Sequence, residues 1–163
     1  MGKDTIVIRE IEPQDNAELE QIIRACFYEF KIPLEGTAYS DKETTKMFES
    51  YQNDNDVYYV VTKGGHVFGG IGVKPLGGGK SELCEIQKMY FSPEIRGEGI
   101  GKKIFKKALD FAKNRNYKQC YIESAPQLKA AIHIYENYGF KHLKKALGDT
   151  GHFSCGVWMI KNL

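Results

Sequence analysis

The sequence of 163 residues contains no apolar run long enough to cross a membrane. Its most apolar stretches, such as residues 57–61, are far shorter than the roughly 18 residues of a membrane-spanning helix. The first residues, Met1 to Asp4, lack the apolar stretch of a secretory signal peptide. These absences exclude a membrane protein as the starting hypothesis, and we expect a cytoplasmic protein with no membrane partner.

Cysteine is also scarce, and its spacing excludes two common uses. Cys26, Cys84, Cys120 and Cys155 are scattered and form no C-x-x-C pair. This pattern fits neither a disulfide framework nor a structural zinc site, so we expect reduced thiols. His152 and Cys155 are the nearest approach to a metal pair or a thiol nucleophile, but the sequence offers no fuller ligand set or orienting acid beside them. We therefore expect no metal.

The overall composition excludes intrinsic disorder and a coiled-coil rod. Hydrophobic residues make up 42% and charged residues 27% of the chain, which is close to the average of globular proteins. A chain of this length corresponds to one domain, which we take to span residues 1–163.

The charges are divided unevenly along the chain. Residues 1–60 hold six basic and thirteen acidic side chains, whereas residues 61–163 hold seventeen and eight, for a net charge of +2. An ordinary mixed surface is one explanation, and two portions that meet ligands of opposite charge are the other.

The hydrophobic periodicity predicts a mixed α/β domain. A capping box at Asp15 and Glu18 begins a helix whose apolar stripe runs from Leu19 to Phe30, and a second box, Ser40 to Glu43, predicts a shorter helix to residue 51. Helices are also predicted at 100–115 and 127–138, and strands at 5–11, 57–63, 66–74, 82–92, 118–124, 140–147 and 152–161. The segment 82–124 is the one unit that requires a parallel strand pair.

A glycine-rich turn joins the strand at 82–92 to the next helix. Its sequence, Arg96-Gly-Glu-Gly-Ile-Gly101, places backbone N–H groups at a helix N-terminus, where they can bind phosphate or pyrophosphate. A dinucleotide-binding fingerprint is an alternative interpretation of this turn. Glu123, about twenty residues further on, favours it, but Lys102 occupies the position of the third glycine that this fingerprint requires. A Walker loop at 79–81 lacks the required earlier glycine and following helix.

The same turn resembles the R/Q-x-x-G-x-G/A acyl-CoA signature of the GNAT superfamily of N-acetyltransferases. Residues 131–140 are similar to that superfamily's second motif, A-x-x-x-Y-x-x-x-G-F, and the two motifs stand at the separation seen in the family. The resemblance covers nearly the whole chain. It implies a central, mostly antiparallel sheet that splays beside the strand at 82–92, flanked by helices, and an acetyl-CoA-dependent N-acetyltransferase.

The resemblance also implies how acetyl-CoA is held. Pantetheine would pair with backbone groups, and the pyrophosphate would lie on N–H groups of the glycine turn, with Arg96 adding charge. The residues implied for pantetheine are Met89, Tyr90 and Phe91, and those for the pyrophosphate are Gly97, Glu98, Gly99, Ile100, Gly101 and Lys102.

Two residues are candidates for the chemistry. An alkylammonium acceptor must lose a proton before it attacks a thioester, and similar acetyltransferases often carry a glutamate for this at the position of Glu85, with Glu82 as a nearby rival. Tyr135 of the second motif is the candidate acid for the leaving thiolate. Leu128 departs from the family, in which many members carry asparagine there.

We therefore expect direct transfer of the acetyl group, in a ternary complex, to a primary amine of a small molecule, a lysine or an N-terminus. The acidic segment 15–56 would border the acceptor and favour a cationic amine. The alternative is a non-catalytic acyl-CoA-binding regulatory module, which Leu128 leaves open. A nucleic-acid partner is not expected, because no RNA or DNA motif accompanies the lysine-rich helix. We expect a monomer or a homodimer, and the sequence contains no motif that identifies the acceptor.

Overall fold

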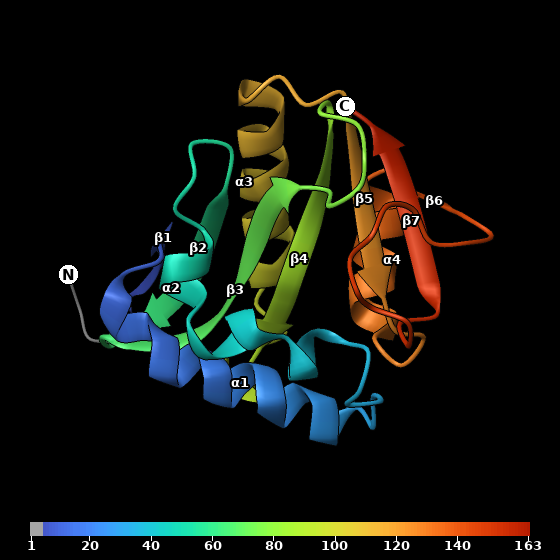
Figure 1. Ribbon diagram of the computed structural model, residues 1–163. Helices are drawn as coiled ribbons and strands as arrows, with labels where there is room; N and C mark the ends of the chain where they lie inside the picture. The colour runs from blue at the N-terminus through green and yellow to red at the C-terminus, as the bar shows by residue number, and fades with distance from the viewer. Residues whose placement is uncertain (1–4) are drawn as a thin grey trace.

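A computed structural model describes residues 5–163, and its centre is one seven-stranded sheet (Figure 1). The strands are β1 (Ile6–Glu10), β2 (Val57–Lys63), β3 (His66–Pro75), β4 (Leu83–Phe91), β5 (Gln119–Ser124), β6 (Lys141–His142) and β7 (Val157–Asn162). Their order in the sheet is β1-β2-β3-β4-β5-β7-β6. All neighbours pair antiparallel except β4 and β5, which are parallel. The predicted mixed, mostly antiparallel fold is confirmed.

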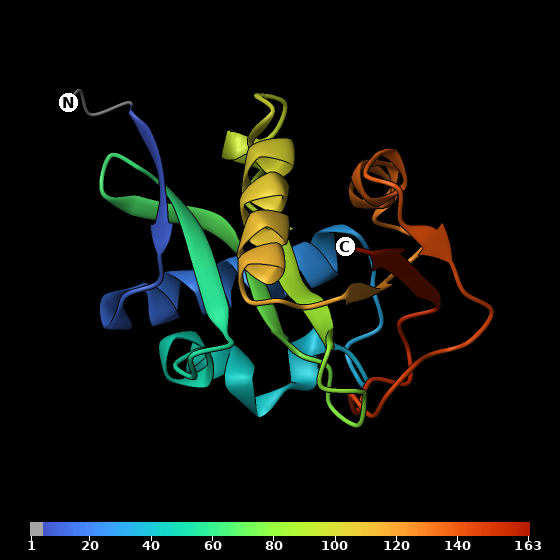
Figure 2. The same ribbon diagram turned by 90° about the horizontal axis from the view of Figure 1, so that it is seen from above.

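Helices cover both faces of the sheet, as the view from above in Figure 2 shows. The helix α1 (Asn16–Glu29), the short helix α2 (Met47–Ser50) and the 3-10 turns at Pro13–Asp15, Ala38–Ser40 and Lys42–Thr45 lie on one face. The helices α3 (Ile100–Asn114) and α4 (Lys129–Asn137) lie on the other. Each face has its own hydrophobic core. No helix within residues 5–163 is long and apolar enough to cross a membrane.

The parallel pair of β4 and β5 separates along its length. The two strands pair from Leu83–Gln119 to Ile86–Ile122, and the ladder then stops although β4 continues to Phe91 (Figure 1). At the same point the register of β4 against β3 shifts, and Lys88 adopts a positive φ of 49°. Such a β-bulge bends the strand locally. The predicted splay is therefore present, and it begins just after Ile86.

The start of α1 differs from the predicted capping box. Asp15 does not cap the helix with its side chain; it accepts a hydrogen bond from the Glu12 amide at 2.7 Å and pairs with Arg9 at 2.8 Å. Glu18 instead accepts a hydrogen bond from the Val67 amide at 3.1 Å. The predicted box is therefore not formed, because Asp15 instead completes a capping box with Glu12 on the preceding 3-10 turn, and Glu18 has a partner on β3 that is distant in the sequence.

The predicted helix over 40–51 is wrong in most of its length. The segment forms two 3-10 turns, and α2 begins only at Met47. The Thr44 hydroxyl donates to the Ala38 carbonyl at 2.6 Å, and Asp41 reaches Lys88 at 3.1 Å. These contacts to the protein interior require an irregular backbone, so tertiary structure overrides the local capping signal.

The two C-terminal strands are shorter than predicted. The predicted strand over 140–147 is reduced to β6, and that over 152–161 begins only at Val157. Between them the chain turns at Gly148, Gly151 and Gly156, all with positive φ, and forms a long loop. The loop binds back through the Phe153 amide, which donates to the Gly36 carbonyl at 3.0 Å. This C-terminal loop, residues 143–156, places His152 and Cys155 at the gap between β4 and β5.

The α1 core gives a test of this architecture. Leu19 is fully buried against the sheet, so Leu19→Ala is expected to lower the free energy of unfolding by about 2–5 kcal/mol. Gln21→Ala, on the exposed side of the same helix, should change it by less than about 0.5 kcal/mol. Urea denaturation of both variants measures the difference. Equal losses would contradict the placement of α1.

Candidate active site

A pocket of about 270 Å³ lies between the end of β4 and the N-termini of α3 and α4. Gly97, Gly99 and Gly101 line it together with Lys102, and Gly99 has a φ of 76° directly before α3 begins. This left-handed conformation is easily adopted only by glycine. The open N-terminus of α3 thus faces the pocket, where backbone N–H groups and the helix dipole favour an anion. We call this the glycine-loop pocket.

Three residues predicted to bind acetyl-CoA at or near this loop have surroundings that differ from the prediction. The Arg96 guanidinium pairs with Glu29 at 2.6 Å and donates to the Phe91 carbonyl at 2.7 Å. Its charge is therefore engaged by α1, and the Phe91 carbonyl is occupied, although both residues line the glycine-loop pocket. Glu98 is exposed. It does not line the glycine-loop pocket.

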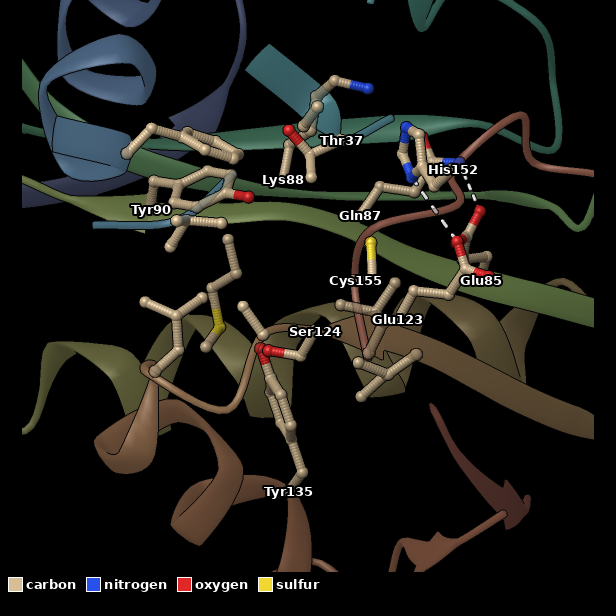
Figure 3. A pocket seen from close by; sticks show the side chains of 18 residues that line it. Thr37, Glu85, Gln87, Lys88, Tyr90, Glu123, Ser124, Tyr135, His152 and Cys155 are labelled. Carbon is tan, nitrogen blue, oxygen red and sulfur yellow. Dashed lines mark hydrogen bonds and ion pairs between the residues drawn. The ribbon is translucent and has the colours of Figure 1, made fainter. Parts of the chain in front are cut away.

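A second, narrower pocket of about 50 Å³ fills the gap between β4 and β5 (Figure 3). Met89, Tyr90 and Leu128 line both this pocket and the glycine-loop pocket, so the two pockets adjoin. We call it the splay pocket. Leu128, the N-cap residue of α4, stands at the junction. Of the residues predicted for pantetheine, Met89 and Tyr90 therefore lie where the two pockets meet, and Phe91 lines the glycine-loop pocket alone.

Glu85 lines the splay pocket from β4 and is buried. Its carboxylate accepts a hydrogen bond from the Gln87 amide group at 2.6 Å, and Gln87 in turn accepts one from the Tyr51 hydroxyl at 2.7 Å. Burial raises the pKa of Glu85 to about 7. A carboxylate with such a pKa can accept a proton near neutral pH. Glu82, the rival from the sequence, is exposed and precedes the first residue of β4.

Tyr135 enters the splay pocket from α4 (Figure 3). Its ring packs against Phe105 with 5.3 Å between centroids, and its side chain points toward Ser124 of β5. Burial raises the pKa of Tyr135, which keeps its hydroxyl protonated at neutral pH. The buried ring fixes the position of this donor. The structure thus brings Glu85 and Tyr135, predicted separately, to one pocket.

A third pocket, which we call the outer pocket, lies between β4, the segment 41–43 and the C-terminal loop. It shares Glu85, Gln87, Lys88 and His152 with the splay pocket. Its acidic side chains are matched by cations: Lys88, which is buried, pairs with Asp41 at 3.1 Å and Glu43 at 3.4 Å, and Lys74 pairs with Glu43 at 3.2 Å. The outer pocket therefore carries charges of both signs.

His152 joins three parts of the chain beside Glu85. Its Nε2 lies 2.9 Å from Asp41 and its Nδ1 lies 3.4 Å from Glu123, while Cys155 lies in the same cluster. Burial disfavours the charged imidazole, but the neighbouring carboxylates of Asp41 and Glu123 outweigh it and raise the pKa of His152 to about 12. Two acids that can orient His152, Asp41 and Glu123, are therefore present in the structure. They come from distant segments, and no local spacing could indicate them.

Glu123 does not take the place that a dinucleotide site requires. Its side chain is almost fully buried and accepts hydrogen bonds from the Thr150 hydroxyl at 2.6 Å and the Tyr121 hydroxyl at 2.8 Å. It lines the splay pocket and not the glycine-loop pocket. Glu123, which favoured the dinucleotide fingerprint, thus binds residues of the C-terminal loop.

Comparison with known proteins gives concordant results. The family model "Acetyltransferase (GNAT) family" matches residues 16–140. A protein of Escherichia coli (strain K12) named "Uncharacterized N-acetyltransferase YjgM" is 39% identical over 158 residues, which cover 96% of this chain and 95% of that protein.

Solved structures share the fold. An acetyltransferase of the GNAT family from Staphylococcus aureus Mu50 superposes with a TM-score of 0.83 at 21% identity, covering 97% of this chain and 99% of that one. A GNAT superfamily phosphinothricin acetyltransferase from Sinorhizobium meliloti, solved in complex with AcCoA, has a TM-score of 0.77 at 22% identity, covering 98% and 89%.

The glycine loop can be tested with a matched pair of variants. Gly99 and Gly65 both have a positive φ and open space where an added Cβ would lie, but only Gly99 lies at the pocket. Gly99→Ala and Gly65→Ala should each cost about 1–2 kcal/mol of stability from backbone strain. Only Gly99→Ala should weaken CoA binding, measured by isothermal titration. Equal affinity of both variants for CoA would contradict the placement of the glycine loop in the binding site.

Proposed function

Because this chain belongs to the acetyltransferase (GNAT) family and is an acetyl-CoA-dependent N-acetyltransferase, we propose that Glu85 and Tyr135 divide the proton transfers of its reaction. The observation that carries this proposal is that the three pockets adjoin one another along β4. The splay pocket shares lining residues with the glycine-loop pocket on one side and with the outer pocket on the other. Glu85 borders the side that leads outward.

The glycine-loop pocket fits acetyl-CoA. Its apolar wall and its volume of about 270 Å³ suit an extended pantetheine chain, and the N-terminus of α3 suits a pyrophosphate. The backbone from Gly97 to Lys102 would hold the phosphates, and Met89 and Tyr90 would hold pantetheine where β4 has lost its partner strand. When bound, acetyl-CoA supplies the activated acetyl group.

Glu85 is the proposed general base. An amine that enters through the outer pocket meets this carboxylate at the mouth of the splay pocket. Its buried position raises its pKa to about 7, so it is sufficiently basic to take a proton from an ammonium group, directly or through water. The Gln87–Tyr51 hydrogen-bond chain holds the carboxylate in place. The neutral amine can then attack the thioester carbonyl.

Tyr135 is the proposed general acid. It enters the splay pocket from α4, on the element opposite β4, and its raised pKa keeps the hydroxyl protonated. It can therefore donate to the sulfur as the thiolate leaves. Backbone N–H groups near Met89 and Tyr90 would polarise the carbonyl, because the ladder to β5 ends before them.

The acceptor is a primary amine in this proposal, and its preference for a positive charge stays a prediction. Asp41 and Glu43 of the acidic segment do line the outer pocket, but Lys88, Lys74 and His152 balance them. The cytoplasmic location and the oligomeric state also stay predictions from the sequence.

The base assignment predicts a pH dependence. Turnover should rise as pH increases through about 7, because Glu85 must be deprotonated to act. The groups around it are Gln87 and Lys88 from β4, Glu123 from β5 and His152 from the C-terminal loop. Glu85→Gln should lower kcat by about 100-fold or more and abolish the rise near pH 7, measured as CoA release with a saturating amine.

Glu82→Gln is the matched control for this variant. It removes an exposed carboxyl three residues away and should leave both kcat and the pH profile as in the parent protein. A parental profile in Glu85→Gln would reject Glu85 as the base, and a lost rise in Glu82→Gln would transfer the role to Glu82.

The acid assignment predicts a separation of binding from turnover. Tyr135→Phe keeps the ring against Phe105 and removes only the hydroxyl, so kcat should fall by about 100-fold while the Kd for acetyl-CoA is unchanged. Tyr138→Phe is the control, since Tyr138 also packs on Phe105 but its hydroxyl points to the Lys102 carbonyl. Full turnover in Tyr135→Phe would exclude the acid role.

A further inference from the structure

The cluster of Glu123, His152 and Cys155 contains three different types of metal-ligating side chain. Their ligand atoms all lie within 4.8 Å of one another, and all three residues line the splay pocket (Figure 3). Two of them come from the C-terminal loop and one from β5. None is needed for the proton transfers proposed above. We propose that this cluster binds a divalent transition-metal ion, with Zn²⁺ as the preferred ion.

The spacing of the ligands suits tetrahedral zinc. Two oxygen or nitrogen ligands about 2.05 Å from Zn²⁺ are about 3.3 Å apart at the tetrahedral angle. The Nδ1 of His152 and the Oε1 of Glu123 are 3.4 Å apart. A sulfur ligand at about 2.3 Å would lie about 3.6 Å from the histidine nitrogen, so small shifts of Cys155 within the 4.8 Å cluster complete the set.

The neighbours of these ligands also resemble the surroundings of a metal. A histidine that binds a metal usually donates its other ring N–H to a carboxylate, and Nε2 of His152 lies 2.9 Å from Asp41. The Glu123 carboxylate is held by the hydroxyls of Thr150 and Tyr121. These contacts fix the orientation of both ligands before the metal arrives.

The ligand types select the ion. One thiolate, one imidazole and one carboxylate form a mixed S/N/O set, which favours Zn²⁺ over Mg²⁺ or Ca²⁺, ions that prefer oxygen alone. When the ion binds, the Cys155 thiol releases its proton and His152 releases the proton on Nδ1, so the thiolate and the Glu123 carboxylate balance the two charges of the ion. Three protein ligands leave the fourth position to water from the splay pocket.

The position of the site gives it a consequence for catalysis. The ion would lie in the pocket that contains Glu85, and His152 also lines the outer pocket through which the amine is proposed to enter. Bound Zn²⁺ should therefore inhibit acetyl transfer in competition with the amine. This consequence rests on the proposed function, whereas metal binding does not.

The site is tested by metal binding to the full chain without acetyl-CoA or amine. The parent protein should bind one Zn²⁺ per chain by isothermal titration, and Co²⁺ in its place should produce a thiolate-to-cobalt absorption band. Cys155→Ser should abolish this band and weaken Zn²⁺ binding by at least about 10-fold. His152→Gln should weaken Zn²⁺ binding by a similar factor. Thermal midpoints near that of the parent would verify that both variants are folded.

Two controls separate this site from adventitious binding. Cys26→Ser removes a thiol outside the cluster, and His133→Gln removes an exposed histidine on α4. Both should bind Zn²⁺ as the parent does. Absence of binding in the parent, or an unchanged affinity in folded Cys155→Ser, would overturn the site. Either result leaves the assignments of Glu85 and Tyr135 unaffected, because those are measured by turnover.

Discussion

The whole site depends on the point at which β4 loses its partner. Parallel pairing with β5 ends at Ile86–Ile122, and the bulge at Lys88 turns the rest of β4 away. Beyond this point the backbone groups of Met89 and Tyr90 have no ladder partner on the β5 side, whereas the Phe91 carbonyl accepts from Arg96, and unpaired backbone groups are costly when buried. They are therefore available to an extended ligand. The same separation opens the splay pocket, with Glu85 just before it and Met89 and Tyr90 just after it.

Helix packing on both faces holds this gap open. On one face α1 packs through fully buried residues such as Leu19 and Phe27, and on the other α3 packs through Ile104 and Phe105. The Arg96–Glu29 ion pair links the glycine loop to α1. The rim of the glycine-loop pocket is thus connected to both layers, so its shape is set by the packing of the entire domain.

The parts of the site that are local in sequence could be predicted from it. The glycine loop is a strand-to-helix turn that its glycine spacing predicts, and Tyr135 belongs to a continuous motif on one helix. The candidate role of Glu85 as a base can be predicted from its position on a long strand together with the family resemblance. The capping boxes predicted at Asp15 and Ser40 are also local signals, but they fail, because Glu18 bonds to Val67 on β3 and Asp41 pairs with Lys88 on β4.

The charged network around His152 could not be predicted in this way. Asp41 and Glu123 are separated by 82 positions, and His152 follows in a loop without regular structure. Only the folded C-terminal loop, bound to Gly36 through Phe153, brings the three together. The segregation of charge along the sequence was a real signal, but it indicated ion pairs within the fold, such as Lys88 with Asp41, as much as charges presented to a ligand.

The most direct test of this account is a crystal structure of the chain with acetyl-CoA. Pyrophosphate is expected on the backbone from Gly97 to Lys102, pantetheine beside Met89 and Tyr90, and the thioester in the splay pocket between Glu85 and Tyr135. Acetyl-CoA bound elsewhere, or a thioester that stops short of the splay pocket, would contradict the claim that the separation of β4 and β5 creates the site.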